Sequence, residues 1–163
     1  MTIFPSSRAV TVQVLMLVFT LSGDLGRAPA QAALLASAPQ VSPVGRWQTI
    51  DGKSGKVKSI VAIREQSGSL NGTIETLFDP PVPHPTCYLC SGTKKDQPLV
   101  GLQVLWGFHA DGREWAGGQV LDPETGKIYR ASLAVEDGGQ KLRLHGYVGI
   151  PLLGRTEYWV RAE

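Results

Sequence analysis

From Val44 onward, apolar residues recur at every second position between short turns that contain glycine. Leu142 and Leu144, for example, alternate with Lys141 and Arg143. A period of two is typical of a β-strand with one buried face, whereas an amphipathic helix would repeat every three or four residues. No stripe of the helical kind is present in this part of the chain. The pattern therefore predicts an all-β fold of antiparallel strands.

Turn sequences such as Asp111-Gly112 and Asp137-Gly138-Gly139 separate the alternating segments, and glycine favours tight hairpin turns. Sheets built only from hairpins leave two exposed edges, and closure into a barrel removes both. We therefore predict a small antiparallel up-and-down barrel of about eight strands. The expected strands lie near residues 44–50, 58–65, 69–77, 100–109, 114–121, 127–135, 140–148 and 155–161.

An eight-stranded barrel is either filled by side chains or hollow enough for one small ligand. Both large aromatic residues and glycines fall on the predicted inner faces, so the sequence leaves this question open. On the strand near 100–109, Leu102, Val104, Trp106 and Phe108 are expected to share one face. We expect the tryptophans to pack in the core and at the barrel end rather than to stack on a ligand. If a cavity exists, the candidates to line it are Trp106, Phe108, Trp115, Tyr129 and Tyr147, with Arg130 or Arg143 holding a polar head group.

The N-terminus has the pattern of an export signal. Arg8 precedes the apolar run Ala9–Leu21, which is too short to span a membrane. Ala30-Gln31-Ala32 has the form cut by signal peptidase, so we expect residues 1–32 to be a signal peptide and the protein to be periplasmic or secreted. The alternative is an uncleaved anchor, because the distance from Leu21 to Ala32 is long for a cleavage region.

The rest of the chain divides into a predicted flexible leader, residues 33–43, and one barrel domain, residues 44–163. Residues 1–32 contain two of the 16 Lys and Arg and one of the 14 Asp and Glu, which leaves 14 basic against 13 acidic residues. A nearly neutral domain gives no indication of a nucleic-acid or anionic membrane partner.

The only two cysteines form the motif Cys87-x-x-Cys90, which follows the proline-rich segment 79–85. In an oxidising compartment we favour a local disulfide that shapes this loop. A loop this short constrains little chain entropy, so the stabilisation would be modest. A redox role is the second interpretation, but nothing around Cys87 resembles the helix start next to a βαβ unit that would activate its thiol.

Metal binding is the third interpretation of the cysteine motif. His84, Cys87 and Cys90 could supply three tetrahedral ligands, with the fourth position open or filled by His109 or His145. Covalent haem attachment is excluded because Ser91, not histidine, follows the motif. We therefore expect no cofactor.

No enzyme is predicted either. A Gly-x-Ser-x-Gly motif is absent, and no serine, histidine and acid combination stands on recognisable elements. Gly52-Lys53-Ser54 matches the end of a phosphate-binding loop, but Trp47 stands where that motif requires its first glycine. We interpret it as a hairpin turn.

Two resemblances to known protein families narrow the range of expected folds. Gly45-Arg46-Trp47, combined with an arginine-bearing last strand 155–161, looks like the lipocalin arrangement. There a tryptophan at the closed barrel end is covered by an arginine of the final strand. The resemblance implies that Trp47 and Arg161 pack against each other.

Residues 44 to 161 also resemble the exported bacterial family catalogued as domain of unknown function 2147. This resemblance implies a small extracytoplasmic barrel similar to lipocalins, and it transfers no activity because the family has none assigned. It is carried by Gly45-x-Trp47, Cys87-x-x-Cys90-x-Gly92-x-x-Lys95-x-x-Pro98, Gly101-Leu102, Trp115-x-x-Gly118, Asp122-Pro123-x-x-Gly126-Lys127-x-Tyr129, Gly146-Tyr147 and Gly154-Arg155-Thr156-x-x-Trp159.

Two functional hypotheses follow. The first is a binding protein for a small, partly apolar or amphipathic molecule, with the cysteine loop as a lid over one mouth of the barrel. The second is a structural or envelope-stress protein whose barrel is filled and whose outer surface contacts another envelope component. The sequence does not identify the ligand or the protein partner.

Overall fold

The computed structural model describes residues 41–163, so the predicted signal peptide and residues 33–40 of the leader lie outside the described part. Within that part the chain forms eight strands and three short 3₁₀ segments. The strands are β1 (Gly45–Ile50), β2 (Val57–Gln66), β3 (Ser69–Leu77), β4 (Gln103–Asp111), β5 (Glu114–Asp122), β6 (Lys127–Glu136), β7 (Lys141–Tyr147) and β8 (Arg155–Arg161), and the 3₁₀ segments are η1 (Gly92–Lys94), η2 (Asp137–Gly139) and η3 (Pro151–Leu153).

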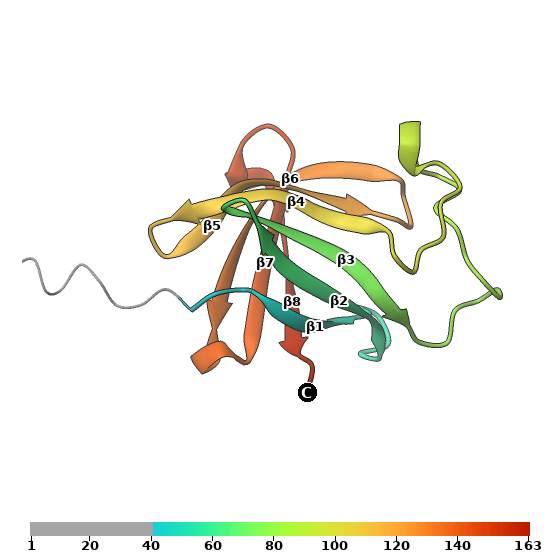
Figure 1. Ribbon diagram of the computed structural model, residues 1–163, viewed down its shortest axis with the longest axis horizontal. Coiled ribbons are helices and arrows are strands. Elements are labelled where there is room, and N and C mark those ends of the chain that lie inside the picture. The colour runs from blue at the N-terminus through green and yellow to red at the C-terminus, as the bar shows by residue number, and fades with distance from the viewer. Residues whose placement is uncertain (1–40) are drawn as a thin grey trace, which may run out of the picture. The chain divides into compact units, whose positions relative to one another are not determined.

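Each strand pairs antiparallel with the next, and β1 pairs with β8 to close the barrel (Figure 1). The predicted fold is therefore confirmed. The eight expected segments correspond to the eight strands. The largest difference is the start of β4, which begins at Gln103 because Gly101 and Leu102 still belong to the preceding loop. That loop is tied to β3 by two hydrogen bonds, from Gly101 N to Ile74 O at 2.8 Å and from Ile74 N to Leu102 O at 3.0 Å.

The barrel has two ends of different construction. At the end that we name the closed end lie the tight turns β2–β3, β4–β5 and β6–β7 together with the last residues of β8. At the other end, the mouth, lie the connections 51–56, 78–102, 123–126 and 148–154. The connection 78–102 is much the longest and carries both cysteines; we name it the Cys loop.

Large side chains fill the barrel interior. Phe108 occupies the space that a side chain at position 118 would need, since a Cβ on Gly118 would overlap its ring. Leu105 occupies the corresponding space at Gly72, where a Cβ would lie 2.9 Å from Leu105 Cδ1. The inward glycines therefore accommodate neighbouring side chains instead of opening a cavity. The largest fully buried side chains are Trp47, Phe108, Ile63, Leu70, Leu102, Leu105, Leu133 and Leu142.

The prediction for the faces of β4 was wrong in one respect. Trp106 does not share a face with Phe108; Leu105 does, and both Leu105 and Phe108 are buried. Two features interrupt the alternation. The β3–β4 register shifts on both sides of Gly72, and Gly107 takes a φ of 76°. Irregularities of this kind move the following side chains to the other face.

The packed domain begins slightly before the predicted boundary. Pro43, the last residue of the predicted leader, is fully buried. Its carbonyl oxygen accepts a hydrogen bond of 2.7 Å from Trp47 Nε1, so a core tryptophan holds it in place. Among residues 41–163, no helix is both long and apolar enough to cross a membrane.

Candidate functional site

The closed end is built around Trp47 of β1 and Arg161 of β8. These residues are paired across the β1–β8 seam, and Cζ of Arg161 lies 4.2 Å from the centroid of the Trp47 ring. Arg161 Nε also donates to Gly139 O at 2.5 Å and Nη1 donates to Val44 O at 3.4 Å. One guanidinium group therefore joins the start of β1, the β6–β7 turn and the end of β8.

Gly45 makes room for this contact. Its φ is +140°, and a Cβ at this position would lie 2.5 Å from Arg161 Nη1. Glycine is thus required both for the backbone conformation and for the approach of the guanidinium. In the Gly-x-Trp motif, the glycine that leaves room for Arg161 thus stands two residues before the tryptophan that Arg161 covers.

The disulfide between Cys87 and Cys90, predicted from the sequence, is confirmed. Both residues are buried. The surrounding backbone folds back on itself: Cys87 N donates to Gln97 O at 2.8 Å, and Asp96 N donates to Cys87 O at 3.1 Å. Lys95 Nζ adds a bond to the carbonyl oxygen of Tyr88. The Cys loop is therefore a compact unit with its own hydrogen bonds.

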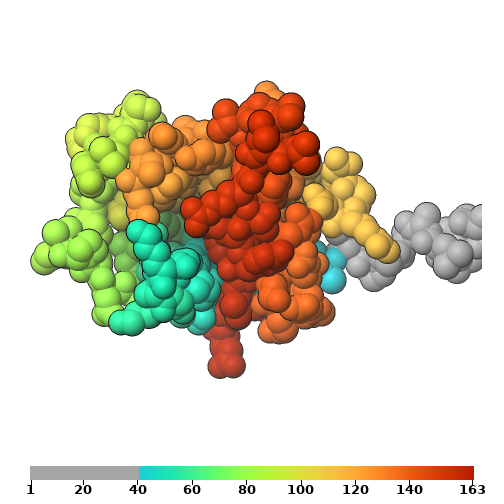
Figure 2. Space-filling model, turned by 180° about the vertical axis from the view of Figure 1, so that it is seen from behind, coloured from blue at the N-terminus to red at the C-terminus, as the bar shows by residue number. Residues whose placement is uncertain are grey.

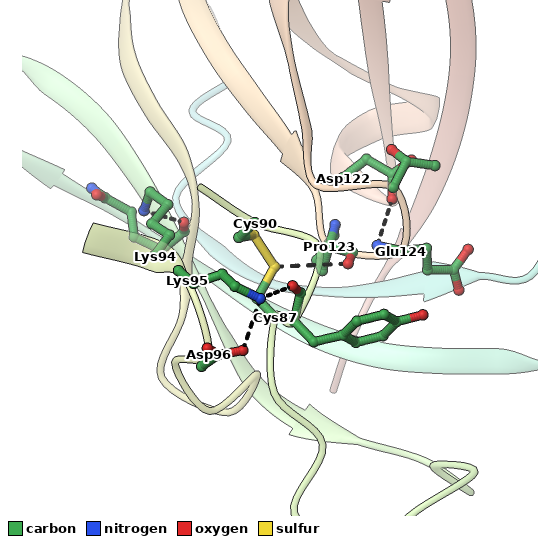
Figure 3. The surroundings of a disulfide bond; sticks show 11 residues. Cys87, Cys90, Lys94, Lys95, Asp96, Asp122, Pro123 and Glu124 are labelled. Atoms are coloured by element: carbon green, nitrogen blue, oxygen red, sulfur yellow. Dashed lines mark hydrogen bonds and ion pairs between the residues drawn. A yellow bond between two sulfur atoms is a disulfide. The ribbon is translucent and has the colours of Figure 1, made fainter. Parts of the chain in front are cut away.

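This unit packs against the β5–β6 turn, as Figure 3 shows. Cys87 Sγ lies 3.7 Å from Pro123 O. Gly126 faces the backbone of Leu89 so closely that a Cβ would overlap the Leu89 carbonyl. On its other side the loop places Lys94 Nζ 4.9 Å from the Trp106 ring, and this amine donates to Gln103 O at 2.8 Å. Burial lowers the pKa of Lys94.

The six residues predicted to line a cavity do not surround a common space. Phe108 and Trp115 are buried in the core. Trp106 lies on the outer wall, where it is half-buried against the core cluster and its Nε1 donates to exposed Gln119 at 2.8 Å. Tyr129 is half-buried opposite Val120.

Arg143 and Tyr147 lie on the outer wall of β7, because the alternating residues Leu142 and Leu144 are the buried ones. Arg143 donates to Glu136 Oε1 at 2.8 Å and to Glu114 Oε1. These two carboxylates, Glu114 first, raise the pKa of Arg143. Tyr147 stacks beside His145 with ring centroids 6.0 Å apart. Neither side chain is available to hold a ligand inside the barrel.

The histidines are not arranged around a metal. Within residues 41–163 no group of three or more His, Cys, Asp or Glu is placed to hold an ion. The sulfurs of Cys87 and Cys90 are bonded to each other, and His84 is exposed. His145 Nε2 donates to Pro151 O at 2.8 Å, which ties β7 to the β7–β8 loop.

The seam between β1 and β8 opens toward the mouth. Over the described residues these strands share only two residue pairs, Trp47 with Arg161 and Gln48 with Val160, whereas β7 and β8 share six. Beyond Gln48 the strands separate and leave a cleft of about 240 Å³. Figure 2 shows the β1–β2 turn, in teal, beside the red surface of β8 at this place. The cleft is lined by Ile50, Gly52, Arg155, Thr156, Glu157 and Tyr158.

Sequence reasoning missed this cleft. Its lining includes Ile50 and Tyr158 together with Arg155 and Glu157, whose Nε and Oε1 lie 3.9 Å apart. The Tyr158 ring also has Lys141 Nζ of β7 5.7 Å from its centroid. The sequence contains one weak indication of the cleft. The turn residues Asp51-Gly52 end β1 after six residues, so β1 is too short to pair with the whole of β8.

Asp51 fixes the turn beside the cleft. Its Oδ1 accepts bonds from Ser54 N at 2.7 Å, Ser54 Oγ at 2.7 Å and Lys53 N at 3.2 Å. The hydrogen bonds from Ser54 are the main cause of a lowered pKa for this carboxyl group, to which Lys53 N and the charge of Lys58 add. These hydrogen bonds hold together the turn that borders the β1 side of the cleft.

Exposed apolar side chains gather around the mouth. Leu152 and Leu153 of η3 are 88% and 75% exposed. The turns at the closed end, in contrast, carry no exposed large apolar residue within the described chain. The exposed apolar residues of the mouth are Phe78, Val82, Tyr88, Leu89, Val100, Ile128, Val148, Ile150, Leu152 and Leu153.

Comparison with solved structures finds a similar barrel in protein HP1028 from the human pathogen Helicobacter pylori, which is described as belonging to the lipocalin family. The TM-score is 0.66 at 21% sequence identity, and the match covers 76% of this chain and 84% of that chain. At this identity the likeness shows a shared fold. None of the curated proteins matches the chain significantly.

A family described as "Uncharacterized protein conserved in bacteria (DUF2147)" matches residues 45–161, from the glycine that admits Arg161 to Arg161 itself. The matched range contains the eight described strands, the disulfide and the cleft. It agrees with the resemblance read from the sequence motifs. The chain therefore belongs to the DUF2147 family and has a lipocalin-like fold.

Proposed function

We propose that this protein is exported and binds a small, partly apolar molecule in the cleft between β1 and β8. The single observation that supports this proposal most is the interruption of the barrel wall, where a concave surface combines Ile50 and Tyr158 with the charged groups of Arg155 and Glu157. Ligand sites commonly combine apolar walls with a few polar groups that fix orientation. The filled interior argues against a ligand deeper in the barrel.

Export is supported by the N-terminal sequence pattern and by the disulfide, which persists in oxidising compartments. N-terminal sequencing of the exported protein tests it. A chain that begins near Ala33 is the expected result, and an intact Met1 or residence in the cytosol would contradict the proposal.

Native mass spectrometry of the purified protein tests ligand binding. We expect a small molecule to co-purify and to be lost from Tyr158→Ala, because Tyr158 is one of the residues that line the cleft. Tyr88→Ala is the matched control, since Tyr88 is an exposed tyrosine on the Cys loop and is not among the residues that line the cleft. Equal retention by both variants, or no bound molecule in the unaltered protein, would contradict a ligand site in the cleft.

The apolar mouth supports a second candidate function, contact with another envelope protein. Four large aliphatic residues, Val148, Ile150, Leu152 and Leu153, are exposed within six positions. Exposed apolar clusters of this kind mark interaction surfaces. Crosslinking in intact cells should lose a specific partner band in the Leu152→Ser, Leu153→Ser double variant, and an unchanged band pattern would contradict this candidate.

A further inference from the structure

The backbone of β8 supplies the most specific chemistry of the cleft. In an antiparallel sheet, the N–H and C=O groups of successive residues point alternately to the two neighbouring strands. Arg161 N donates to Gln140 O on the β7 side at 2.9 Å, and Ala162 N donates to Arg46 O on the β1 side at 2.9 Å. Every second residue before Ala162 points its main-chain groups to the same side. The N–H and C=O groups of Tyr158 and Thr156 therefore point toward β1.

Beyond Gln48, no residue of β1 is paired with β8. Continuing the register from Gln48 and Val160 would place Ile50 opposite Tyr158 and Gly52 opposite Thr156. The register of β1 shifts at Thr49 and Ile50, and the chain then turns away at Asp51, whose N and O bond to Lys56 O and Gly55 N. The residues that would have paired line the cleft instead.

Among residues 41–163, Thr156 and Tyr158 of β8 thus present one donor and one acceptor each along a strand edge that pairs with no residue of β1. Such an edge is a template for another extended chain. Recognition by strand addition takes its affinity from main-chain hydrogen bonds and its selectivity from pockets for alternate side chains. Ile50 and Tyr158 provide an apolar contact at this edge, and the charged groups of Arg155 and Glu157 stand beside it.

We propose that the ligand of the cleft is a short extended peptide segment that pairs with the free edge of β8 at Thr156 and Tyr158. This inference rests on the proposed function, because it names the chemical class of the molecule that the cleft binds. A peptide of about five residues, at roughly 3.4 Å per residue, covers the two edge residues and their flanks. A non-peptide apolar molecule would use the same walls but not the main-chain groups.

Nuclear magnetic resonance of the ¹⁵N-labelled full domain distinguishes these ligands. The first probe is a pool of acetylated, amidated pentapeptides with randomised side chains; the second is the same pool with N-methyl groups on the three central backbone nitrogens; the third is decanoate. We expect the first pool to shift the amide signals of Thr156 and Tyr158 and to slow their hydrogen exchange at least tenfold. N-methylation should abolish this protection, because it removes the donors of the added strand.

Variants of Thr156 test the same hydrogen bonds from the side of the protein, by removing a main-chain N–H of β8. Thr156→Pro removes the N–H that faces the cleft but none that faces β7, and proline is tolerated on strand edges. It should weaken peptide binding at least tenfold, read from the Tyr158 amide. Thr156→Ala, which keeps the N–H and loses only the contact of Oγ1 with His145 Nδ1 at 2.9 Å, should change binding less than threefold.

The outcomes separate the two proposals. Binding of the methylated pool as strongly as the unmethylated pool, or equal binding by Thr156→Pro and Thr156→Ala, would overturn strand addition. Signals at Tyr158 that move with decanoate but not with peptides would also overturn it and leave the proposed function standing. If no probe moves the cleft signals and no molecule co-purifies, both proposals fail.

Discussion

The closed end and the mouth are made from the same eight strands but are stabilised in different ways. At the closed end, Arg161 stacks on Trp47 and bonds to Gly139 and Val44, so residues from both ends of the barrel sequence meet in one place. At the mouth, the Cys loop is held by bonds within itself, by two bonds to Ile74 of β3, by one from Lys94 to Gln103 of β4, and by contact with the neighbouring turn at Pro123. We therefore expect the closed end to contribute more to the stability of the barrel, and the mouth to tolerate changes in shape without unfolding.

The sharpest test of this comparison removes the central side chain of the closed end. Trp47→Ala should lower the free energy of unfolding by about 3–5 kcal/mol, the usual cost of deleting a buried tryptophan. Denaturant unfolding measures it. Trp106→Ala is the control on the outer wall beside the Cys loop, and its effect should be clearly smaller. Equal losses would show that the closed end has no special part in stability.

A glycine substitution tests the same contact from the other side. Gly45→Ala should cost about 3 kcal/mol, because it adds both an unfavourable φ and a clash with Arg161. Gly55→Ala at the mouth also has a positive φ, +69°, but nothing lies within 4 Å of its Cβ position. Its cost should be limited to about 1 kcal/mol of backbone strain. Thermal unfolding of the two variants side by side decides whether packing against Arg161 accounts for the difference.

Removal of the disulfide should affect the mouth alone. A closed loop of about four residues accounts for only about 2 kcal/mol of stabilisation, so the Cys87→Ala, Cys90→Ala double variant should still fold. Hydrogen exchange followed by mass spectrometry should show faster exchange in residues 78–102 and unchanged exchange in β1 and β8 near Trp47. Faster exchange at both ends would contradict their independence.

Loss of the Asp51 charge should give the smallest effect, and it is followed at the β1–β2 turn. The pKa of Asp51 is lowered, chiefly by hydrogen bonds from Ser54, so it lies below the unfolded value of about 3.9. Ionised Asp51 therefore stabilises the turn at neutral pH, and this contribution is lost as the pH falls through the folded pKa. The carboxyl carbon of Asp51 should titrate below about 3.9 by nuclear magnetic resonance. Asp51→Asn should lose the transition while the signals of the closed end stay unchanged.

The fold could be predicted because its determinants are local. Alternation of apolar residues defines a strand with one buried face, and pairs such as Asp111-Gly112 define a hairpin turn, so strand number and order follow from sequence. The Cys87–Cys90 disulfide was predictable for the same reason, since the chain contains no other cysteine.

The site could not be predicted in the same way. The faces of β4 depend on register shifts around Gly72, which arise from pairing with β3 and leave no mark in the alternation of β4 itself. The cleft depends on where β1 leaves the register of β8, two strands that are more than a hundred residues apart in sequence. Strand pairing at that distance is decided by closure of the whole barrel.

The distribution of tryptophans determines what intrinsic fluorescence can report. Trp47 and Trp159 are buried at the closed end, and Trp115 is buried with no hydrogen-bond acceptor for its Nε1 among the described residues. Trp106 alone lies on the outer wall, under Lys94 of the Cys loop. No tryptophan lines the cleft. Tryptophan emission from this protein should thus follow unfolding of the closed end and movement of the Cys loop, whereas occupancy of the cleft should leave it unchanged unless a fluorescent label is placed beside Tyr158.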